Sequence, residues 1–281
     1  MVPKPRPIDY LIVGHVTQDL TPQGAVLGGT ASFSGLTAHA LGRRVGILTA
    51  AASDIELGPL CDLQVHCLDS EATSTFQNTY GPEGRIQHIL ARAEDLRFET
   101  LPPEWSTVGL LHCAPVANEV DQAFLTKVSS HMVGLTPQGW LRQWDPSGEI
   151  SLNHWEIIRP YLTPASVVVL SQEDLGGTIE ATSEIAMHCR ILAVTMGAEG
   201  ALVFAEGESR HLPAPEVTEV DPTGCGDIFA TIFFVCLENG DSPWTAAAIS
   251  NQLAARSVTR AGLASIPLPE EIQAAFQLRV S

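Results

Sequence analysis

The turn spanning residues 220–227 combines an acid with breakers of regular structure in a way that could carry out chemistry. It reads Val-Asp-Pro-Thr-Gly-Cys-Gly-Asp, and the apolar run 228–237 follows directly. Pro222, Gly224 and Gly226 interrupt regular structure, whereas the residues after Asp227 contain no breaker, so a tight turn is expected to lead into a buried helix. The first N–H groups of a helix lack intrahelical partners and attract anions such as phosphate. The turn therefore predicts an anion site.

A carboxylate at such a site needs a chemical reason. Asp227 would repel a bound phosphate unless it accepts a proton during the reaction. An anion cradle beside a carboxylate suits phosphoryl transfer to a hydroxyl, in which the protein supplies position and electrostatic stabilisation and a base takes the hydroxyl proton. The simpler interpretation is a Gly-rich turn in which Asp227 only caps the helix, because Asp is common at the N-cap. Spacing alone leaves both interpretations open.

The same turn closely resembles the C-terminal signature of the ribokinase/PfkB family of carbohydrate kinases, Asp-Thr-Thr-Gly-Ala-Gly-Asp. This chain departs from that pattern only at Pro222 and Cys225. The resemblance implies that Asp227 is the catalytic base and that Gly224, Cys225 and Gly226 form the anion hole. It also implies ATP as the phosphoryl donor, Mg²⁺ as the bridging cation and, in many members, a monovalent cation.

Short apolar segments predict the strands that would position this turn. Continuous apolar runs are typical of parallel sheets covered by helices on both faces. Such runs span 8–14, 45–50, 108–116, 132–135 and 166–170, and residues 191–204 read as a strand, a glycine turn and a second strand. Helices are expected after the Gly28-Gly29 pair, over 180–188, after Asp227 and over 244–259, the last stopped by Gly262. The sequence thus predicts an α/β fold.

The resemblance makes this fold a ribokinase-like three-layer α/β/α domain with a mostly parallel central sheet. No linker or repeat divides the chain, so residues 1–281 are expected to form a single domain. The β-prone runs 74–80 and 85–90 flank a Gly-Pro loop and predict a hairpin. By resemblance, about 15–27 and 74–92 contribute a small β-sheet lid over the substrate.

Candidate acceptor-binding residues follow the first strand and lie in the hairpin. Asp19 lies just beyond that strand, where open α/β sheets bind ligands, and the family carries a hydroxyl-binding Asp at this offset; it could otherwise be a turn residue. Gly28 and Gly29 let backbone approach a ligand or simply begin a helix. Asn78 and Arg85 are plausible donors from the lid, or solvated residues of a surface hairpin.

Two further segments bear on the acceptor. Arg142 belongs to a Gln-Gly-x-x-Arg segment that looks like the inositol-kinase-like and nucleoside-kinase branches; it could hold a phosphate or simply pair with an acid. Phe33 stands where ribokinase-type enzymes usually have a substrate-binding Asn, and the variant Gly-Gly-x-Ala-Ser-Phe is similar to the myo-inositol kinase branch. The resemblance therefore favours a sugar or cyclitol acceptor over a ribose-like one.

The nucleotide and metal assignments rest on the resemblance. Ser171 and Asp174 take the place of the family's Asn-x-x-Glu, with Glu173 adjacent, and a shorter Asp could bind magnesium through water; these acids could equally cap the helix over 180–188. The remaining nucleotide-binding candidates are Thr195, Gly197 and Gly200 of a Thr-x-Gly-x-x-Gly segment, Thr223 with Gly224 and Gly226 in the turn of residues 220–227 (the anion turn), and Asn251 near the adenine.

Composition excludes several classes of protein. The 281 residues carry a net charge of −17, so a surface that tracks nucleic-acid phosphates is not expected. The six cysteines form no C-x-x-C pair, which predicts reduced thiols, a cytoplasmic setting and no zinc site. The basic, Pro-rich residues 1–7 resemble neither a signal peptide nor a membrane span, and no apolar run is long enough to cross a membrane.

Together these features predict an ATP-dependent, magnesium-requiring kinase that acts on a sugar or a myo-inositol-like cyclitol, as a monomer or homodimer. Two alternatives remain open. One is a nucleoside kinase of the same superfamily. The other is a non-catalytic protein that binds a sugar or nucleotide.

Overall fold

The computed structural model describes residues 7–22, 24–81, 84–177 and 179–279. Within these residues nine strands form the main sheet, in the order β15-β14-β13-β12-β9-β8-β1-β4-β5. Their bounds are β1 Tyr10–Val13, β4 Val45–Ala51, β5 Gln64–Asp69, β8 Thr107–Cys113, β9 Ser129–Leu135, β12 Val167–Ser171, β13 Ile191–Thr195, β14 Ala201–Ala205 and β15 Glu208–Leu212. The strands from β5 to β13 pair in parallel, and β14 and β15 are antiparallel additions at one edge.

The strand order reverses at β1. From β1 the chain proceeds outward through β4 and β5, then returns to β8 on the other side of β1 and continues outward through β9, β12 and β13. The loops after β1 and β8 therefore diverge at the carboxyl edge of the sheet. Such a switch point leaves a crevice in which open α/β sheets bind ligands.

Alternate residues of the central strands pack against different helices. Tyr10 and Ile12 of β1 point into a core formed with α1 (Thr30–Ala40), α6 (Cys225–Glu238), α7 (Pro243–Ser257) and α8 (Pro269–Ala275). Leu11 and Val13 point to the opposite face, which α2 (Phe124–Lys127), α3 (Gln138–Leu141), α4 (Arg159–Leu162) and α5 (Ile179–Ala186) cover. Both faces of the sheet are thus buried, which explains the uninterrupted apolar runs of its strands.

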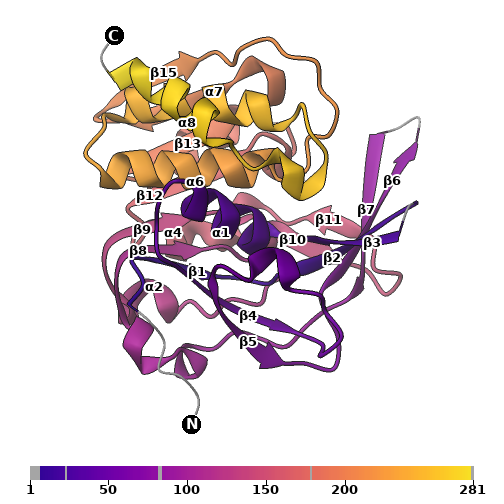
Figure 1. Ribbon diagram of the computed structural model, residues 1–281. Coiled ribbons are helices and arrows are strands. Elements are labelled where there is room, and N and C mark those ends of the chain that lie inside the picture. The colour runs from indigo at the N-terminus through magenta and orange to yellow at the C-terminus, as the bar shows by residue number, and fades with distance from the viewer. Residues whose placement is uncertain (1–6, 23, 82–83, 178, 280–281) are drawn as a thin grey trace.

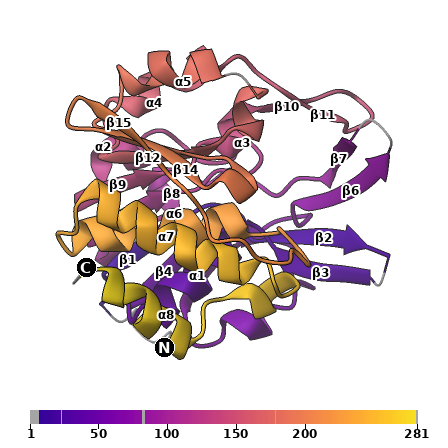
Figure 2. The same ribbon diagram turned by 90° about the horizontal axis from the view of Figure 1, so that it is seen from above.

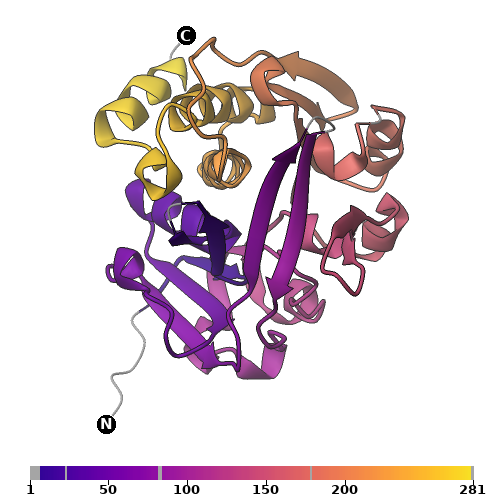
Figure 3. The ribbon, with the colours of Figure 1, turned by 90° about the vertical axis from the view of Figure 1, so that its right-hand side faces the viewer.

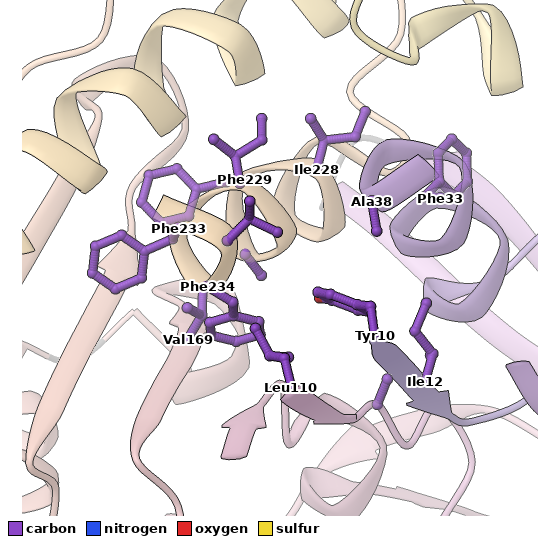
Figure 4. Packing of buried hydrophobic residues seen from close by; sticks show 14 of the residues in the cluster. Tyr10, Ile12, Phe33, Ala38, Leu110, Val169, Ile228, Phe229, Phe233 and Phe234 are labelled. Carbon is purple, nitrogen blue, oxygen red and sulfur yellow. The ribbon is translucent and has the colours of Figure 1, made fainter. Parts of the chain in front are cut away.

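The helix after the anion turn lies at the centre of the first of these cores. Ile228, Phe229, Phe233 and Phe234 of α6 are buried, and Figure 4 shows Phe234 directed toward Tyr10 and Leu110 of the sheet. Burying aromatic rings of this size stabilises a fold by roughly 1.5–3 kcal/mol each. This packing fixes the start of α6 against the carboxyl edge of the sheet.

A second, smaller sheet projects from the main body, at the right in Figure 1. It has the order β3-β2-β6-β7, with β2 Thr17–Thr21, β3 Gly24–Gly28, β6 Thr75–Gly81 and β7 Gly84–Ala91. The predicted hairpin is confirmed, because β6 and β7 pair antiparallel, whereas β2 and β6 run parallel. Figure 2 shows the long β6–β7 ribbon extending beyond the body, with the short ribbon β10 (Arg142–Trp144) and β11 (Ile150–Leu152) beside it, and in Figure 3 the β6–β7 ribbon runs across the front of the molecule.

The fold expected from the sequence, a three-layer α/β/α domain with a mostly parallel sheet and a small additional sheet, is confirmed. The last expected helix ends earlier than predicted: α7 stops at Ser257, because the Val258 carbonyl accepts the N–H groups of Val220 and Asp221. Gly262 does not stop this helix but begins a 3-10 turn. The 3-10 turns lie at Gly58–Leu60, Phe98–Thr100, Pro103–Trp105, Trp155–Ile158, Glu173–Leu175, Gly197–Glu199, Gly262–Ser265 and Phe276–Arg279.

No helix within the described ranges is both long enough and apolar enough to cross a membrane.

Candidate active site

The anion turn enters α6 through a glycine. Gly224 is the N-cap of α6 with φ 77°, so Asp227 is the third residue of the helix, and the expectation that Asp227 caps the helix is wrong. Asp221 stabilises the turn instead: its carboxylate accepts the N–H of Thr223 (2.9 Å) and that of Gly262 (2.9 Å). Asp221 thereby fixes the turn, and the carboxylate of Asp227 makes no capping hydrogen bond to the start of α6.

The amides of the turn do not all have the same role. The N–H of Cys225 donates to the Pro222 carbonyl (3.1 Å), whereas the next two N–H groups, of Gly226 and Asp227, belong to the first turn of α6 and have no helical acceptor. They add to the positive end of the helix dipole. This end of α6 can therefore bind an anion within reach of the Asp227 side chain.

Asp227 carries a perturbed carboxyl group. Burial raises its pKa to about 6; a hydrogen bond from the Thr30 side chain and the positive charge of Arg142 oppose that rise, and the charges of Asp174 and Asp19 add to it. These four neighbours come from α1, β10, the turn after β12 and β2. A carboxyl group with a pKa near neutrality among such neighbours is typical of a general base.

Asp19 lies in β2 of the small sheet, and Gly28 makes room for it. The Thr17 hydroxyl donates to the Asp19 carboxylate (3.1 Å), and burial raises the pKa of Asp19, against the effect of Thr17 and Arg142. A Cβ atom on Gly28 would lie 2.3 Å from the Asp19 carboxylate. Gly29, with φ 84°, is the N-cap of α1. The Gly-Gly pair is therefore required by internal packing, whatever it contacts in a ligand.

Arg142 is a buried cation between the two acids. It begins β10, and its guanidinium donates to the Val116 carbonyl (3.0 Å) and lies over the Phe76 ring, 5.4 Å from the centroid. The positive charge of Arg142 opposes the rise in pKa that burial causes at both Asp19 and Asp227. Arg142 thus interacts both with Asp19 of β2, which follows β1, and with Val116 in the loop after β8.

The small sheet contributes a polar group to this crevice. Asn78 lies in β6 on the same face as Phe76, and its side-chain oxygen is shielded from solvent and has no hydrogen-bond partner among the described residues. A buried acceptor of this kind is costly unless a ligand satisfies it. Arg85 belongs to β7, but its side chain lies outside the described residues.

Phe33 does not replace the expected Asn as a polar contact. It is buried (2% exposed), and its ring lies against Gly224, where a Cβ would approach a ring carbon to 2.2 Å. Phe33 therefore supports the anion turn from α1.

The acids after β12 hold their own turn together. The carboxylate of Asp174 accepts the Ser171 N–H (2.9 Å) and the Gln138 side-chain amide (3.0 Å), and the Ser171 hydroxyl accepts the Asp174 N–H (3.1 Å). Asp174 is buried and Glu173 is exposed in a 3-10 turn. Glycines separate this turn from α5, so the alternative in which these acids cap that helix is wrong.

The magnesium assignment meets a sparse ligand set. No group of three or more His, Cys, Asp or Glu side chains that could hold a metal occurs among the described residues. Mg²⁺ commonly binds through one or two carboxylates together with substrate phosphates and several waters. The predicted pair, Asp174 and the adjacent Glu173, offers one buried and one exposed carboxylate for such a site.

The other nucleotide candidates lie along the same edge. Thr195 ends β13, Gly197 (φ 57°) begins a 3-10 turn that Gly200 (φ 95°) follows, and Thr223 is exposed in the anion turn. Asn251 is buried in α7, where its amide donates to the carbonyls of Leu212 (2.7 Å) and Pro213 (3.4 Å). Its amide thus fastens the chain after β15 to α7.

Sequence reasoning did not single out two residues that contact the acids. Thr30 hydrogen-bonds Asp227, and Gln138 bonds Asp174. A hydroxyl directly after the Gly-Gly pair was a visible signal for Thr30. The Gln138 contact spans 36 residues and joins turns after two different strands, so no local pattern indicated it.

Cys225 gives a test of the turn geometry. Its thiol is half-buried and directed at the Ala254 carbonyl of α7 (3.5 Å), and burial raises its pKa to about 11. Because this pKa lies about 2 above that of an ordinary thiol, the fraction of Cys225 present as the reactive thiolate is about 100-fold smaller. We expect maleimide at pH 7.5 to label the exposed Cys61 well before Cys225, as followed by peptide mass spectrometry. Equally fast labelling of both thiols would contradict this placement.

Comparisons with known proteins place the chain among kinases. Residues 162–271 match the family described as pfkB family carbohydrate kinase. The inositol 3-kinase of Zea mays is 25% identical over 271 residues, covering 95% of this chain and 69% of that protein. The cytidine kinase of Thermococcus kodakarensis is 23% identical over 254 residues, covering 83% and 90%.

Solved structures share the fold over nearly the whole chain. A pyrophosphate-dependent kinase in the ribokinase family, complexed with a pyrophosphate analogue and myo-inositol, superimposes with a TM-score of 0.81 at 18% identity and covers 94% of this chain and 99% of its own. Ribokinase from Thermotoga maritima gives a TM-score of 0.74 at 19% identity, covering 96% and 99%.

Proposed function

The chain belongs to the ribokinase/PfkB family of carbohydrate kinases, and on this premise we propose that it transfers the γ-phosphoryl group of ATP to a hydroxyl of an uncharged sugar or myo-inositol-like cyclitol. The observation that carries the proposal is Asp227, a carboxyl group with its pKa raised to about 6, at the anion-binding end of α6 and beside Asp19 and Arg142. A base and an anion site in one helical turn are what phosphoryl transfer to a hydroxyl requires.

In the proposed mechanism Asp227 accepts the proton of the attacking hydroxyl. The N–H groups at the start of α6 stabilise the charge on the transferred phosphoryl group, with the helix dipole aligned toward it. Thr30 orients the carboxylate of Asp227 through its hydrogen bond. Bound Mg²⁺ would neutralise phosphate charge, held from Asp174 and the adjacent Glu173 directly or through water.

The acceptor is proposed to be uncharged because of the balance of charge around it. Among the described side chains, Asp19 and Asp227 face one cation, Arg142, which also donates to the Val116 carbonyl. An anionic sugar phosphate would meet a net negative site. A polyol, in contrast, offers hydroxyl donors to Asp19 and to the unsatisfied oxygen of Asn78. The small sheet that carries both residues is proposed to act as the lid that excludes water.

The similarity to inositol kinases supports a cyclitol. The maize relative is an inositol 3-kinase, and the neighbouring pyrophosphate-dependent kinase was solved with myo-inositol. The apolar Phe33, packed on the anion turn rather than exposed to the acceptor, agrees with this branch.

Two alternatives are favoured by particular similarities. The cytidine kinase relative covers 83% of the chain and supports a nucleoside acceptor. The pyrophosphate-dependent neighbours support a donor without adenosine, and the Asn251 amide, already bonded to two carbonyls, is not available to an adenine ring in this structure. ATP remains the proposed donor because ribokinase of Arabidopsis thaliana, with the same fold, was solved with ribose and ATP.

The deciding experiment measures turnover for ATP and for pyrophosphate, each with Mg²⁺ and each against myo-inositol, ribose, fructose and cytidine. The proposal expects ATP with myo-inositol or a hexose to give the highest kcat/KM. Cytidine as the best acceptor would replace it by the nucleoside-kinase alternative, and pyrophosphate as the better donor would overturn the ATP assignment. No turnover, together with ligand-induced rises in melting temperature, would indicate a binding protein.

The proposed base also predicts a pH dependence. With its pKa near 6, Asp227 is ionised and competent above that pH and protonated below it, so kcat/KM should fall about tenfold per pH unit below 6. Initial rates between pH 5 and 8 would show this acid limb. Because Arg142 lowers this pKa, Arg142→Met should move the midpoint upward. A rate that stays constant down to pH 5 would contradict the assignment.

A further inference from the structure

The small sheet leaves the main body through a narrow root. Three chain segments meet there: residues 14–16 before β2, Ser74 before β6, and residues 93–94 after β7. One side chain, that of His15, contacts the other two segments, although they are 59 and 79 residues away in sequence. His15 is fully buried and has no place in the mechanism above.

The contacts of His15 define one tautomer. One ring nitrogen, Nε2, lies 2.9 Å from the Glu94 carbonyl, which can only accept, so Nε2 carries the proton. The other, Nδ1, lies 2.8 Å from the Ser74 hydroxyl and accepts its proton. The Ser74 oxygen in turn accepts the N–H of Ala93 (3.0 Å). Each polar atom of this bridge is therefore satisfied with a neutral imidazole.

The backbone at His15 is anchored to the main body. Its N–H donates to the buried carboxylate of Glu119 (3.0 Å), which also accepts the N–H groups of Val116 and Ala117. The next N–H, that of Val16, donates to the Thr49 hydroxyl (2.8 Å). The imidazole thus joins a fixed point of the body to the two other strands that enter the small sheet.

Burial acts against a charge on this ring. It lowers the pKa of His15, and Glu119 opposes that effect only in part. A neutral ring keeps one donor and one acceptor, which matches the Glu94 carbonyl and the Ser74 hydroxyl.

From these contacts we propose that His15 is a positioning residue for the acceptor site: it holds β2 and β6 in register at their root, so that Asp19 and Phe76 face Arg142. The Gln18 N–H donates to the Ser74 carbonyl (2.9 Å), and Asp19 pairs with Phe76 in the parallel register that begins there. Asp19 is four residues beyond His15, and Phe76 is two beyond Ser74. A shift at the root therefore moves both of them relative to Arg142.

The role at the acceptor rests on the proposed function, whereas the structural role does not. The first test is hydrogen–deuterium exchange of the full chain, which needs no substrate. His15→Phe removes both ring hydrogen bonds, and we expect amides of β2, β6 and β7 to exchange about tenfold faster, the effect of losing one or two buried hydrogen bonds. Amides of β1, β8 and β12 should keep their rates.

Matched variants separate this role from general destabilisation. His112 is an equally buried histidine, bonded to Tyr10 and Thr136 in the main sheet, so His112→Asn should leave the exchange of the small sheet unchanged. His15→Asn keeps an acceptor near Ser74 but loses Glu94 and should give an intermediate effect. Ser74→Ala deletes one oxygen of the bridge and tests the proposal if His15→Phe does not fold.

The second test measures steady-state kinetics with ATP as donor and myo-inositol as acceptor. His15→Phe should raise the KM of myo-inositol about tenfold and leave the KM of ATP unchanged, because the proposed nucleotide residues follow β13, away from the small sheet. Faster exchange in all strands alike, or none in the small sheet, overturns the proposal. Local exchange as expected with no kinase activity in the parent chain would refute the proposed function and leave the root role standing.

Discussion

Replacing Asp227 by Ala is expected to lower kcat by two to four orders of magnitude while the KM of ATP changes little. A positioned general base contributes about 10²–10⁴-fold to a proton transfer, and that contribution exists only in the transition state. The anion-binding N–H groups of α6 belong to the backbone and remain in the variant. Steady-state kinetics with the best acceptor of the panel, and ATP binding by calorimetry, would measure the two quantities separately.

Asp227→Asn is the sharper control, because it keeps the shape of the side chain and removes its charge. Near-normal turnover in either variant would refute the assignment of the base. A decrease of kcat that is matched by weaker ATP binding would instead indicate damage to the anion turn.

The same substitution should stabilise the protein at neutral pH. The folded-state pKa of Asp227, about 6, lies above the unfolded value of 3.8, so the carboxyl group favours the folded state only while it is protonated. This stabilisation is lost as the pH rises through 6. At pH 8, above both pKa values, the ionised group costs about 3 kcal/mol. Asp227→Asn should therefore raise the free energy of unfolding at pH 8 by about that amount, with the gain vanishing near pH 4. Denaturant unfolding at both pH values checks this; equal stabilities at pH 8 would contradict the buried charge.

The sequence predicted the chemistry of the anion turn better than its geometry. The glycines and the apolar run that follows indicated the turn and the helix, because these are local signals. The cap was assigned to Asp227, whereas Gly224 occupies it and Asp221 stabilises the turn through a contact with Gly262, 41 residues away. Side-chain hydrogen bonds across such separations have no periodic pattern in the sequence.

The same limit applies to the acceptor site. Asp19 and Arg142 could each be proposed from the position of a strand end or a motif, but their proximity depends on the reversal of strand order at β1. Phe33 was recognised as a departure from the family pattern, yet only the packing of α1 on α6 shows that its ring supports Gly224. His15 gave no signal at all, because its partners belong to the far ends of a hairpin.

The two glycines of the anion turn should respond very differently to Ala. In Gly224→Ala the new Cβ would lie 2.2 Å from the Phe33 ring in a backbone with φ 77°, so both steric overlap and left-handed strain oppose the native turn. The strain alone costs about 1–2 kcal/mol, and displacing the amides at the start of α6 should cost about 10²–10³-fold in kcat, as for loss of an oxyanion donor. Thermal unfolding and steady-state kinetics would measure both effects.

Gly226→Ala is the matched control, because its Cβ would meet no atom within 4 Å. We expect this variant to unfold at the parental temperature or slightly above, since Ala favours a helix over Gly by about 1 kcal/mol. If Gly226 serves to admit a phosphate close to the backbone, the methyl group should nevertheless raise the KM of ATP at unchanged stability. Stable Gly226→Ala with parental kinetics would place the phosphate elsewhere, and parental stability of Gly224→Ala would contradict the packing of Phe33 on the turn. The pair thus separates a glycine required by the fold from one required by the ligand.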